Sequence, residues 1–201
     1  DYFSPDEKTR LSVLASAANT DRDSYCGPGN DPLKAYGKTT DLTAMGGAQY
    51  VHTFDKCFFM PSDLTAGLEY NRDRLKDNMW GYNRHTDQTV NIYSAFLQNE
   101  WKNDRWGILI GGRLDKHNMV DNVIFSPRAN LRFNPTQNIN LRLSYSSGFR
   151  APQAFDEDMH IENVGGTVAM IERAKDLKEE KSQSFSVSAD MYHRFGAFQT
   201  N

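Results

Sequence analysis

The amino-acid sequence predicts an all-β fold, an antiparallel up-and-down meander of about eight long strands, and three observations lead to this prediction. Apolar and polar residues alternate with a period of two along most of the chain, as in strands with one dry face and one wet face. Short turns alternate with longer polar links between these segments. No helical pattern of comparable strength interrupts the alternation.

The clearest alternation lies in the second half of the chain, at residues 125–133, 138–150 and 184–195. In the middle segment, the apolar face carries Ile139, Leu141, Leu143, Tyr145 and Phe149, and the polar face carries Asn140, Arg142, Ser144, Ser146 and Arg150. Weaker copies lie at residues 9–20, 39–54, 63–74, 89–102 and 105–117. The arginines of the polar faces indicate that these faces are wet or line a polar interior.

The connections are of two kinds. The short ones are Asn103-Asp104, residues 134–137 and the slightly longer 55–62, and they carry the Asn, Asp and Pro of tight turns. The long, polar ones are residues 21–38, 75–88, 116–123 and 151–178. Because successive connections of a meander alternate between its two ends, the short turns gather at one end and the long links at the other. This is the layout of an outer-membrane β-barrel.

The positions of the aromatic residues support the prediction of a barrel. They lie next to the short-turn end, where a belt at one water and lipid boundary belongs. The members of this predicted belt are Phe54, Phe58, Phe59, Trp101, Trp106, Phe133 and Phe195.

Composition and charge exclude several classes of protein. The 23 Lys and Arg against 26 Asp and Glu give a net charge of −3, without the basic excess of a nucleic-acid binder. The longest apolar stretches, residues 11–18 and 106–112, are too short for a spanning helix. The chain starts without Met or a signal segment, so we expect a mature or excised piece.

The alternation alone leaves a second fold open. A soluble, secreted β-sandwich also has strands that are apolar inside and polar outside, and it would act as a carbohydrate-binding module. A glycoside hydrolase is a third, weaker alternative that depends only on exposed Asp, Glu and Trp. The length of the segment at residues 39–54 favours a tilted membrane span, because strands of soluble proteins usually have five or six residues.

Two stretches carry a family resemblance. Residues 144–157 read Ser-Tyr-Ser-Ser-Gly-Phe-Arg-Ala-Pro-Gln-Ala-Phe-Asp-Glu, and residues 177–184 read Leu-Lys-Glu-Glu-Lys-Ser-Gln-Ser. They resemble the barrel of TonB-dependent outer-membrane receptors, in which a strand ending Gly-Phe-Arg-Ala-Pro enters an outside loop and the next strand begins with a Leu-Lys-Pro-Glu-like segment. Glu179 stands where that family often has Pro.

Further positions extend the resemblance over residues 124–190. Phe125-Ser126-Pro127-Arg128 and Asn134-Pro135-Thr136 resemble the preceding hairpin of that family. The Gly-Gly-Arg-Leu-Asp sequence at residues 111–115 resembles receptors from the Bacteroidales in particular.

The resemblance implies a transporter rather than an enzyme, and it implies no cofactor. Such receptors hold a plug domain inside a barrel of about 22 strands, so residues 1–201 are expected to be an internal section of the barrel, without plug, signal peptide or terminal strand. The implied function is capture of a scarce nutrient, such as an iron chelate, cobalamin or an oligosaccharide, at extracellular loops. The implied partners are the plug, the remaining strands, an energising TonB-type protein, outer-membrane lipid and a surface lipoprotein.

Candidates for ligand capture lie in the predicted links. Trp80, Tyr82, Arg84 and His85 offer aromatic faces with cations, which suit a sugar, an aromatic chelate or a carboxylate. The alternative is a folded loop whose Trp packs on its neighbours. Tyr25 and Tyr36 are weaker candidates of the same kind. His117, near the top of its strand, could face the ligand, but an ordinary solvated histidine is the preferred interpretation.

The strand-end motif consists of Gly148, Phe149, Arg150, Ala151 and Pro152. Arg150 falls on the polar face, so it is expected to pair with carboxylates of the lumen or plug and to orient the following link. Pro152 restricts Ala151 to extended conformations and helps to end the strand.

Other parts of this last link are less specific. The acidic run Asp156-Glu157-Asp158 with His160 could bind a hard cation, but acidic loops are usually only solvated, so no metal site is predicted. Residues 170–177 could form a short helix.

The two cysteines test the strand layout. Cys26 falls in a long link and Cys57 in a short turn, at opposite ends of one strand. A disulfide needs Cα atoms within about 7 Å, whereas a strand of this length separates them by tens of ångströms. The prediction is therefore that they do not form a bond within one chain.

Overall fold

The computed structural model describes residues 1–25, 36–80, 84–154, 162–163, 167–168, 177–195 and 198–200. Its strands are β1 (Tyr2–Phe3), β2 (Thr9–Tyr25), β3 (Tyr36–Cys57), β4 (Met60–Met79), β5 (Arg84–Lys102), β6 (Trp106–His117), β7 (Ile124–Thr136), β8 (Ile139–Arg150), β9 (Glu162–Asn163), β10 (Thr167–Val168), β11 (Glu180–Met191), β12 (His193–Phe195) and β13 (Phe198–Thr200).

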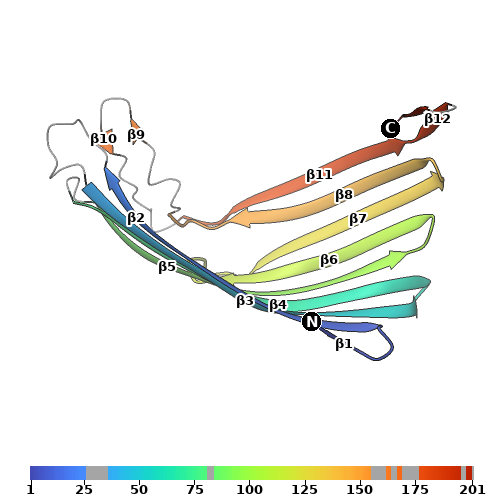
Figure 1. Cartoon of the computed structure of the whole chain (residues 1–201), viewed down its shortest axis with the longest axis horizontal. Coiled ribbons are helices and arrows are strands. Elements are labelled where there is room, and N and C mark those ends of the chain that lie inside the picture. The colour runs from blue at the N-terminus through green and yellow to red at the C-terminus, as the bar shows by residue number, and fades with distance from the viewer. Residues whose placement is uncertain are drawn as a thin grey trace.

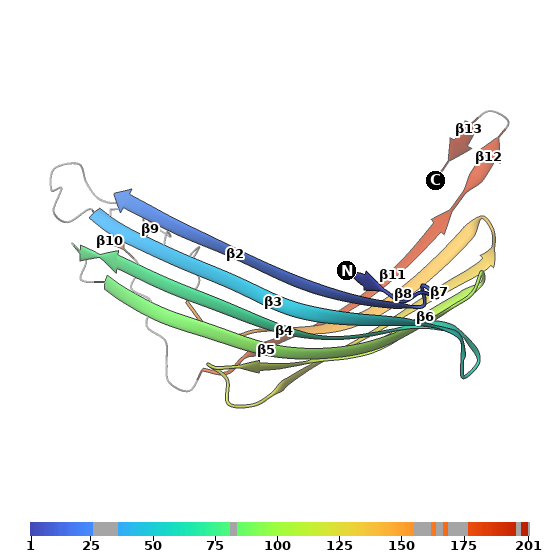
Figure 2. The ribbon, with the colours of Figure 1, turned by 60° about the horizontal axis from the view of Figure 1, so that its bottom comes forward.

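One curved sheet contains all the long strands. Nine strands are hydrogen-bonded in the order β1-β2-β3-β4-β5-β6-β7-β8-β11, and every pair is antiparallel. Figures 1 and 2 show this sheet as a section of curved wall with β2 near one side and β11 at the other. The predicted meander of eight long strands is confirmed, and β1 adds a short strand at the edge.

Strands β2 to β5 are longer at the loop end than the alternation predicted. Strand β4 continues to Met79 and β5 starts at Arg84, inside the predicted link at residues 75–88. Likewise, β2 reaches Tyr25 and β3 starts at Tyr36. Figure 2 shows these four strands projecting past β6, β7 and β8. The predicted strands ended too early because the projecting part carries polar residues on both faces, and the alternation of apolar and polar residues is lost there.

The last predicted strand is wrong at its end. Residues 184–195 were expected to form one strand, but β11 ends at Met191, and β12 pairs with β13 instead. Strand β8 begins at Ile139, so the residues that follow Met191 have no strand partner on β8. The backbone N–H of Tyr192 donates instead to the carbonyl of Asn138, in the turn before β8, at 2.8 Å.

Side chains fix the short turns. The Asn103 Oδ1 atom accepts hydrogen bonds from the backbone N–H groups of Arg105 (2.9 Å) and Trp106 (2.7 Å), which is the way Asn closes a turn. The predicted turn at residues 55–62 is tighter than expected, because β3 and β4 leave only Phe58 and Phe59 between them. Phe58 has a positive φ of 61°.

Local contacts also order the chain before β2. The carboxylate of Asp6 accepts hydrogen bonds from the Ser4 hydroxyl and from the Lys8 backbone, and these lower the pKa of Asp6. The Lys8 ammonium pairs with Asp55 at the end of β3, and this hydrogen bond raises the pKa of Lys8.

The sheet has an apolar outer face in continuous register. Leu143 stands opposite Leu131 on one side and Val187 on the other, and Leu131 stands opposite Ile108. Large apolar side chains of this face are exposed, and Val187 reaches 81%. No second layer covers the face within the part of the chain that the structure describes. The sandwich alternative therefore fails, because its apolar rows would pack against a second sheet.

Aromatic side chains mark both edges of this outer face. At the short-turn end Trp106 stacks on Phe133 with ring centroids 4.2 Å apart, and Phe59 stacks on Trp101 at 5.7 Å. Towards the loop end, Tyr70 and Tyr93 lie 4.9 Å apart. On β5 the two rows are about 27 Å apart along the strand, which suits the apolar band of a membrane barrel once the strand is tilted. Of the predicted belt, the side chain of Phe195 lies outside the described residues.

Candidate functional site

The link that follows β8 folds back over the inner face of the sheet. Ala151 is buried together with Val120 and Ile124, and Phe149 packs against this cluster. The Gln153 backbone N–H donates to the Ala151 carbonyl at 2.9 Å, which turns the chain inward. The start of the link therefore lies over the ends of β6 and β7 rather than extending into solvent.

Gln88 of β5 holds this link by two hydrogen bonds. Its Nε2 donates to the Ala154 carbonyl at 2.9 Å, and its Oε1 accepts from the Ala154 backbone N–H at 3.0 Å. The amide thus satisfies both backbone groups of Ala154, as a neighbouring strand would. A residue of β5 and the link after β8 are joined across 66 positions of sequence.

His117 holds the same link from the end of β6. Its Nδ1 accepts the backbone N–H of Met119 at 3.0 Å, so the proton of the neutral ring must lie on Nε2. Nε2 lies 3.0 Å from Gln153 Oε1 and therefore donates to it. His117 is 0% exposed. The solvated reading of this histidine is wrong, and its two ring nitrogens are already used inside the fold.

We expect Gln88→Ala to release the link after β8 without unfolding the sheet. The substitution removes both bonds to Ala154 and leaves the strand ladder of β5 intact. A spin label at Ala154 of the intact receptor, which keeps the backbone groups that Gln88 binds, would become more mobile. Protease cleavage near residue 154 would become faster. Thr89→Ala is the matched control on the same strand, and equal mobility in the two variants would contradict the role of Gln88.

Arg84 and Asp77 form a buried ion pair. The Asp77 Oδ2 atom lies 2.8 Å from one terminal guanidinium nitrogen of Arg84 and accepts from its Nε at 3.0 Å, while Thr39 donates to Oδ1 at 2.7 Å. Side-chain exposure is 5% for Arg84 and 0% for Asp77. The pair joins β4 to β5, and Thr39 adds β3. Arg84 was predicted to lie in a loop and contact ligand, but its guanidinium is occupied within the inner face.

The other predicted ligand contacts lie apart from this pair. Trp80 follows β4 and is 56% exposed. His85 lies in β5, where its Nδ1 is 2.9 Å from Asn78 Oδ1, and it belongs to the outer row of side chains. Tyr36 is also on the outer side and packs edge-on against Tyr25 at 5.2 Å. Tyr82 lies outside the described residues.

At the strand-end motif, Arg150 is the last residue of β8, is exposed and stands opposite Glu180. Gly148 stands opposite Ser182 in the same ladder. Lower on the same polar face, Arg142 forms an ion pair with Asp190 at 3.1 Å. The face therefore carries arginines towards the lumen, as the alternation predicted, and some of their charge is balanced within the sheet.

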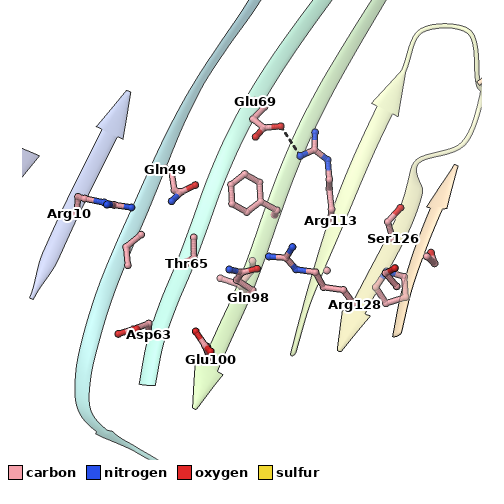
Figure 3. Close-up of a pocket in the computed structure, with 17 residues that line it drawn as sticks. Arg10, Gln49, Asp63, Thr65, Glu69, Gln98, Glu100, Arg113, Ser126 and Arg128 are labelled. Atoms are coloured by element: carbon pink, nitrogen blue, oxygen red, sulfur yellow. Dashed lines mark ion pairs between the residues drawn. The ribbon is translucent and has the colours of Figure 1, made fainter. Parts of the chain in front are cut away.

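A polar hollow of about 630 Å³ lies on the concave face of the sheet. Its charged lining consists of Arg10, Asp63, Glu69, Glu100, Arg113 and Arg128 (Figure 3). Arg113 is held by Glu69 at 2.6 Å and by Asp115 at 2.8 Å, and Asp115 accepts from Ser94 at 2.6 Å. The sequence prediction assigned no role to this network.

Several sequence expectations fall where the structure gives no description. These are Asp156-Glu157-Asp158 with His160, most of the helix predicted at residues 170–177, and Cys26. Cys57 is a free thiol. Within the described ranges, no three His, Cys, Asp or Glu side chains gather as metal ligands would. The same ranges contain no helix that is long and apolar enough to cross a membrane.

Comparison with known protein families identifies the family to which the chain belongs. The model of the family described as TonB dependent receptor-like, beta-barrel, matches residues 3–201. The chain belongs to this family. TonB-dependent receptors are transporters of the bacterial outer membrane, so the chain is a section of an outer-membrane barrel and not an enzyme.

Two solved structures share the fold of this TonB-dependent receptor segment. One is the siderophore receptor PirA from Acinetobacter baumannii, with a TM-score of 0.68 and 16% identity, and the other is PirA from Pseudomonas aeruginosa, with 0.58 and 13%. Each match covers 95% of this chain, but only 31% and 38% of the respective receptor. No curated protein matches. These findings give no support to the predicted origin in the Bacteroidales.

Proposed function

We propose that this chain forms part of the barrel wall of a receptor that takes up an iron chelate with energy from a TonB-type protein. The observation that supports the iron chelate, rather than cobalamin or an oligosaccharide, is the fold shared with two structures named as siderophore receptors. Strands β2, β4, β6 and β8 of the curved sheet all end at the same side, and this supports extracellular capture of the ligand by the links that follow them.

The concave face suits contact with a plug domain. The hollow there offers cations at Arg10 and Arg128 and a carboxylate at Glu100, while its Arg113 and Asp63 are already paired within the sheet. A surface of both signs pairs with a polar, charged partner and not with lipid. In the proposed transport cycle the plug rests on this face, a TonB-type protein displaces it from the periplasmic side, and the ligand passes along the wall. A surface lipoprotein that hands ligand to the extracellular loops belongs to the same proposal.

Trp80 is the proposed ligand contact that the structure leaves most available. The residue is 56% exposed at the end of β4, on the extracellular side of the sheet. An aromatic face stacks on the planar rings of an aromatic chelate. Tyr82 stays in the proposal as the next aromatic residue after Trp80 in the sequence. Tyr36 shares the outer side of the sheet with His85, and Arg84 and His117 act by holding the loop end together.

Uptake of chelated radioactive iron by cells that produce the intact receptor tests this function. We expect uptake of a ferric catecholate to require both the receptor and the TonB-type protein. Trp80→Ala should weaken binding of this chelate by about three- to thirtyfold, the range of one aromatic contact. His85→Ala, on the outer side, is the matched control and should bind normally.

Two results would contradict the proposal. Uptake of cobalamin or an oligosaccharide, together with no uptake of ferric catecholates or hydroxamates, would show another substrate. Equal chelate affinity of the wild type and Trp80→Ala would remove the predicted contact, even if iron uptake itself is confirmed.

A further inference from the structure

The outer face of the sheet contains an apolar hollow just below the Tyr70 and Tyr93 row. It has a volume of about 550 Å³ and lies across β3, β4, β5 and β6. Three small residues, Gly46, Ala48 and Ala95, form its floor. Larger side chains surround them, namely Leu68, Tyr70, Tyr93 and Leu114.

Gly46 shows that the hollow is open. A Cβ atom added there would meet no atom within 4 Å. Gly46 stands opposite Ala15 on one side and Tyr70 on the other, so it belongs to the outer row. By contrast, Gly112 of the same face is covered by the ring of Phe125, which a Cβ at Gly112 would meet at 2.5 Å. The space over Gly112 is therefore filled by a side chain, whereas the space over Gly46 is empty.

Cationic and amide groups lie at the extracellular rim of the hollow. Lys116 lines it, and its ammonium is fixed by the carbonyls of Val120 (3.1 Å) and Asp121 (2.6 Å), which leaves one of its three N–H donors for a ligand. Tyr70 donates to Asn91 Oδ1 at 2.8 Å, so the amide nitrogen of Asn91 is the group left to donate outward.

Arg72 adds a second cation to the rim. It lies two residues beyond Tyr70 on β4, towards the extracellular end, and stands opposite Asn91. Its side chain is exposed and makes no ion pair with any residue that the structure describes. Lys116 stands opposite Tyr93 on the other side of β5. The Cα atoms of Arg72 and Lys116 are separated by two strand spacings across the sheet and two residues along the strand, which is about 12 Å. Side chains of this length can therefore reach the same lipid headgroup.

Among the residues that the structure describes, no carboxylate forms an ion pair with Arg72 or Lys116. Glu69 and Asp115 alternate to the lumenal side, where both bind Arg113. Asp87 is on the outer side, but it pairs with Lys76 at 3.4 Å. The rim therefore presents positive charge directly above an apolar hollow, at the height where a lipid headgroup meets its acyl chains.

We propose that this outer hollow binds one acyl lipid of the outer leaflet whose headgroup carries a phosphate. One acyl chain fills the space over Gly46, Ala48 and Ala95, and the phosphate accepts hydrogen bonds from Lys116 and Arg72. The site depends on the outward orientation of this face in the barrel. It does not depend on which nutrient the receptor carries, so each of the two proposals can fail without the other.

Native mass spectrometry of the intact receptor in detergent tests the site with two probes that share their acyl chains, dioleoyl phosphatidic acid and dioleoyl phosphatidylcholine. We expect selective retention of the phosphatidic acid. The double variant Arg72→Ala with Lys116→Ala should weaken it by at least about tenfold. Gly46→Leu should weaken it as well, because leucine fills the hollow without changing the charge. Ala48→Leu provides the same test at a second position of the floor.

Two matched controls keep the result specific. Lys76→Ala removes an outer-face cation that is already paired, and Ala129→Leu adds a leucine to the outer face of β7. Both should retain phosphatidic acid like the wild type. Equal retention of the two lipids would overturn the proposal, because it indicates ordinary boundary lipid. Unchanged retention in the charge variant, or in both leucine variants, would overturn it too.

Discussion

Ile110→Arg is expected to destabilise the barrel by about 2–4 kcal/mol, the cost of a cation facing lipid near the bilayer midplane. Ile110 lies on the outer face of β6, midway between Trp106 of the lower aromatic row and Leu114 beside the upper hollow, and it is 56% exposed. The arginine would have no counter-ion there, because its cross-strand neighbours are Asn99 and Ala129. Urea titration of the intact receptor folded into lipid vesicles measures the change.

Asn130→Arg is the control for this effect. Asn130 is next to Ala129 on β7 and alternates to the lumenal side, between Arg128 and Arg132. We expect a far smaller loss of stability from Asn130→Arg, since the lumenal face is polar and wet. An equal loss in both variants would contradict the assignment of the outer face to lipid.

Asp77→Ala should destabilise the loop end by about 3–5 kcal/mol, because it leaves the buried guanidinium of Arg84 without its counter-ion. The substitution also removes the acceptor of the Thr39 hydroxyl. Hydrogen exchange of the backbone amides at the upper ends of β3, β4 and β5 would become faster. The effect should be local, because the pair lies beyond the membrane band.

Lys76→Ala is the comparison for the buried pair. Lys76 and Asp87 join the same two strands on the exposed outer side, and exposed pairs contribute little. The double variant Asp77→Leu with Arg84→Met should recover part of the loss, since it leaves no unpaired charge. Similar exchange rates in Asp77→Ala and Lys76→Ala would refute the structural role assigned to Asp77 and Arg84.

Sequence alternation predicted the membrane part of this fold well, and physical reasons explain why. One face meets lipid and the other meets water, so each strand there carries a period of two that a short window detects. Leu143 was assigned to the apolar face, and the register places it between Leu131 and Val187. Tight turns at Asn103 and Asn134 then fixed which end carried the long links.

The candidate site was predicted less well, because its contacts join distant parts of the sequence. Nothing near Gln88 indicates that it binds Ala154, and nothing near His117 indicates that it binds Gln153. Arg84 was expected to contact ligand because a cation beside two aromatic residues suits a binding loop. Its partner Asp77 lies in the preceding strand, and only the hairpin register of β4 and β5 brings the two together.

Spin labels on the intact receptor in lipid vesicles test the central claim most directly, with Leu141 and Val187 on the outer face compared with Arg142 and Ser186 on the inner face. We predict that labels at 141 and 187 collide readily with apolar oxygen and that labels at 142 and 186 do not. Immobile labels at 141 and 187 that oxygen cannot reach would contradict the account, because the apolar rows would then be covered by protein instead of lipid.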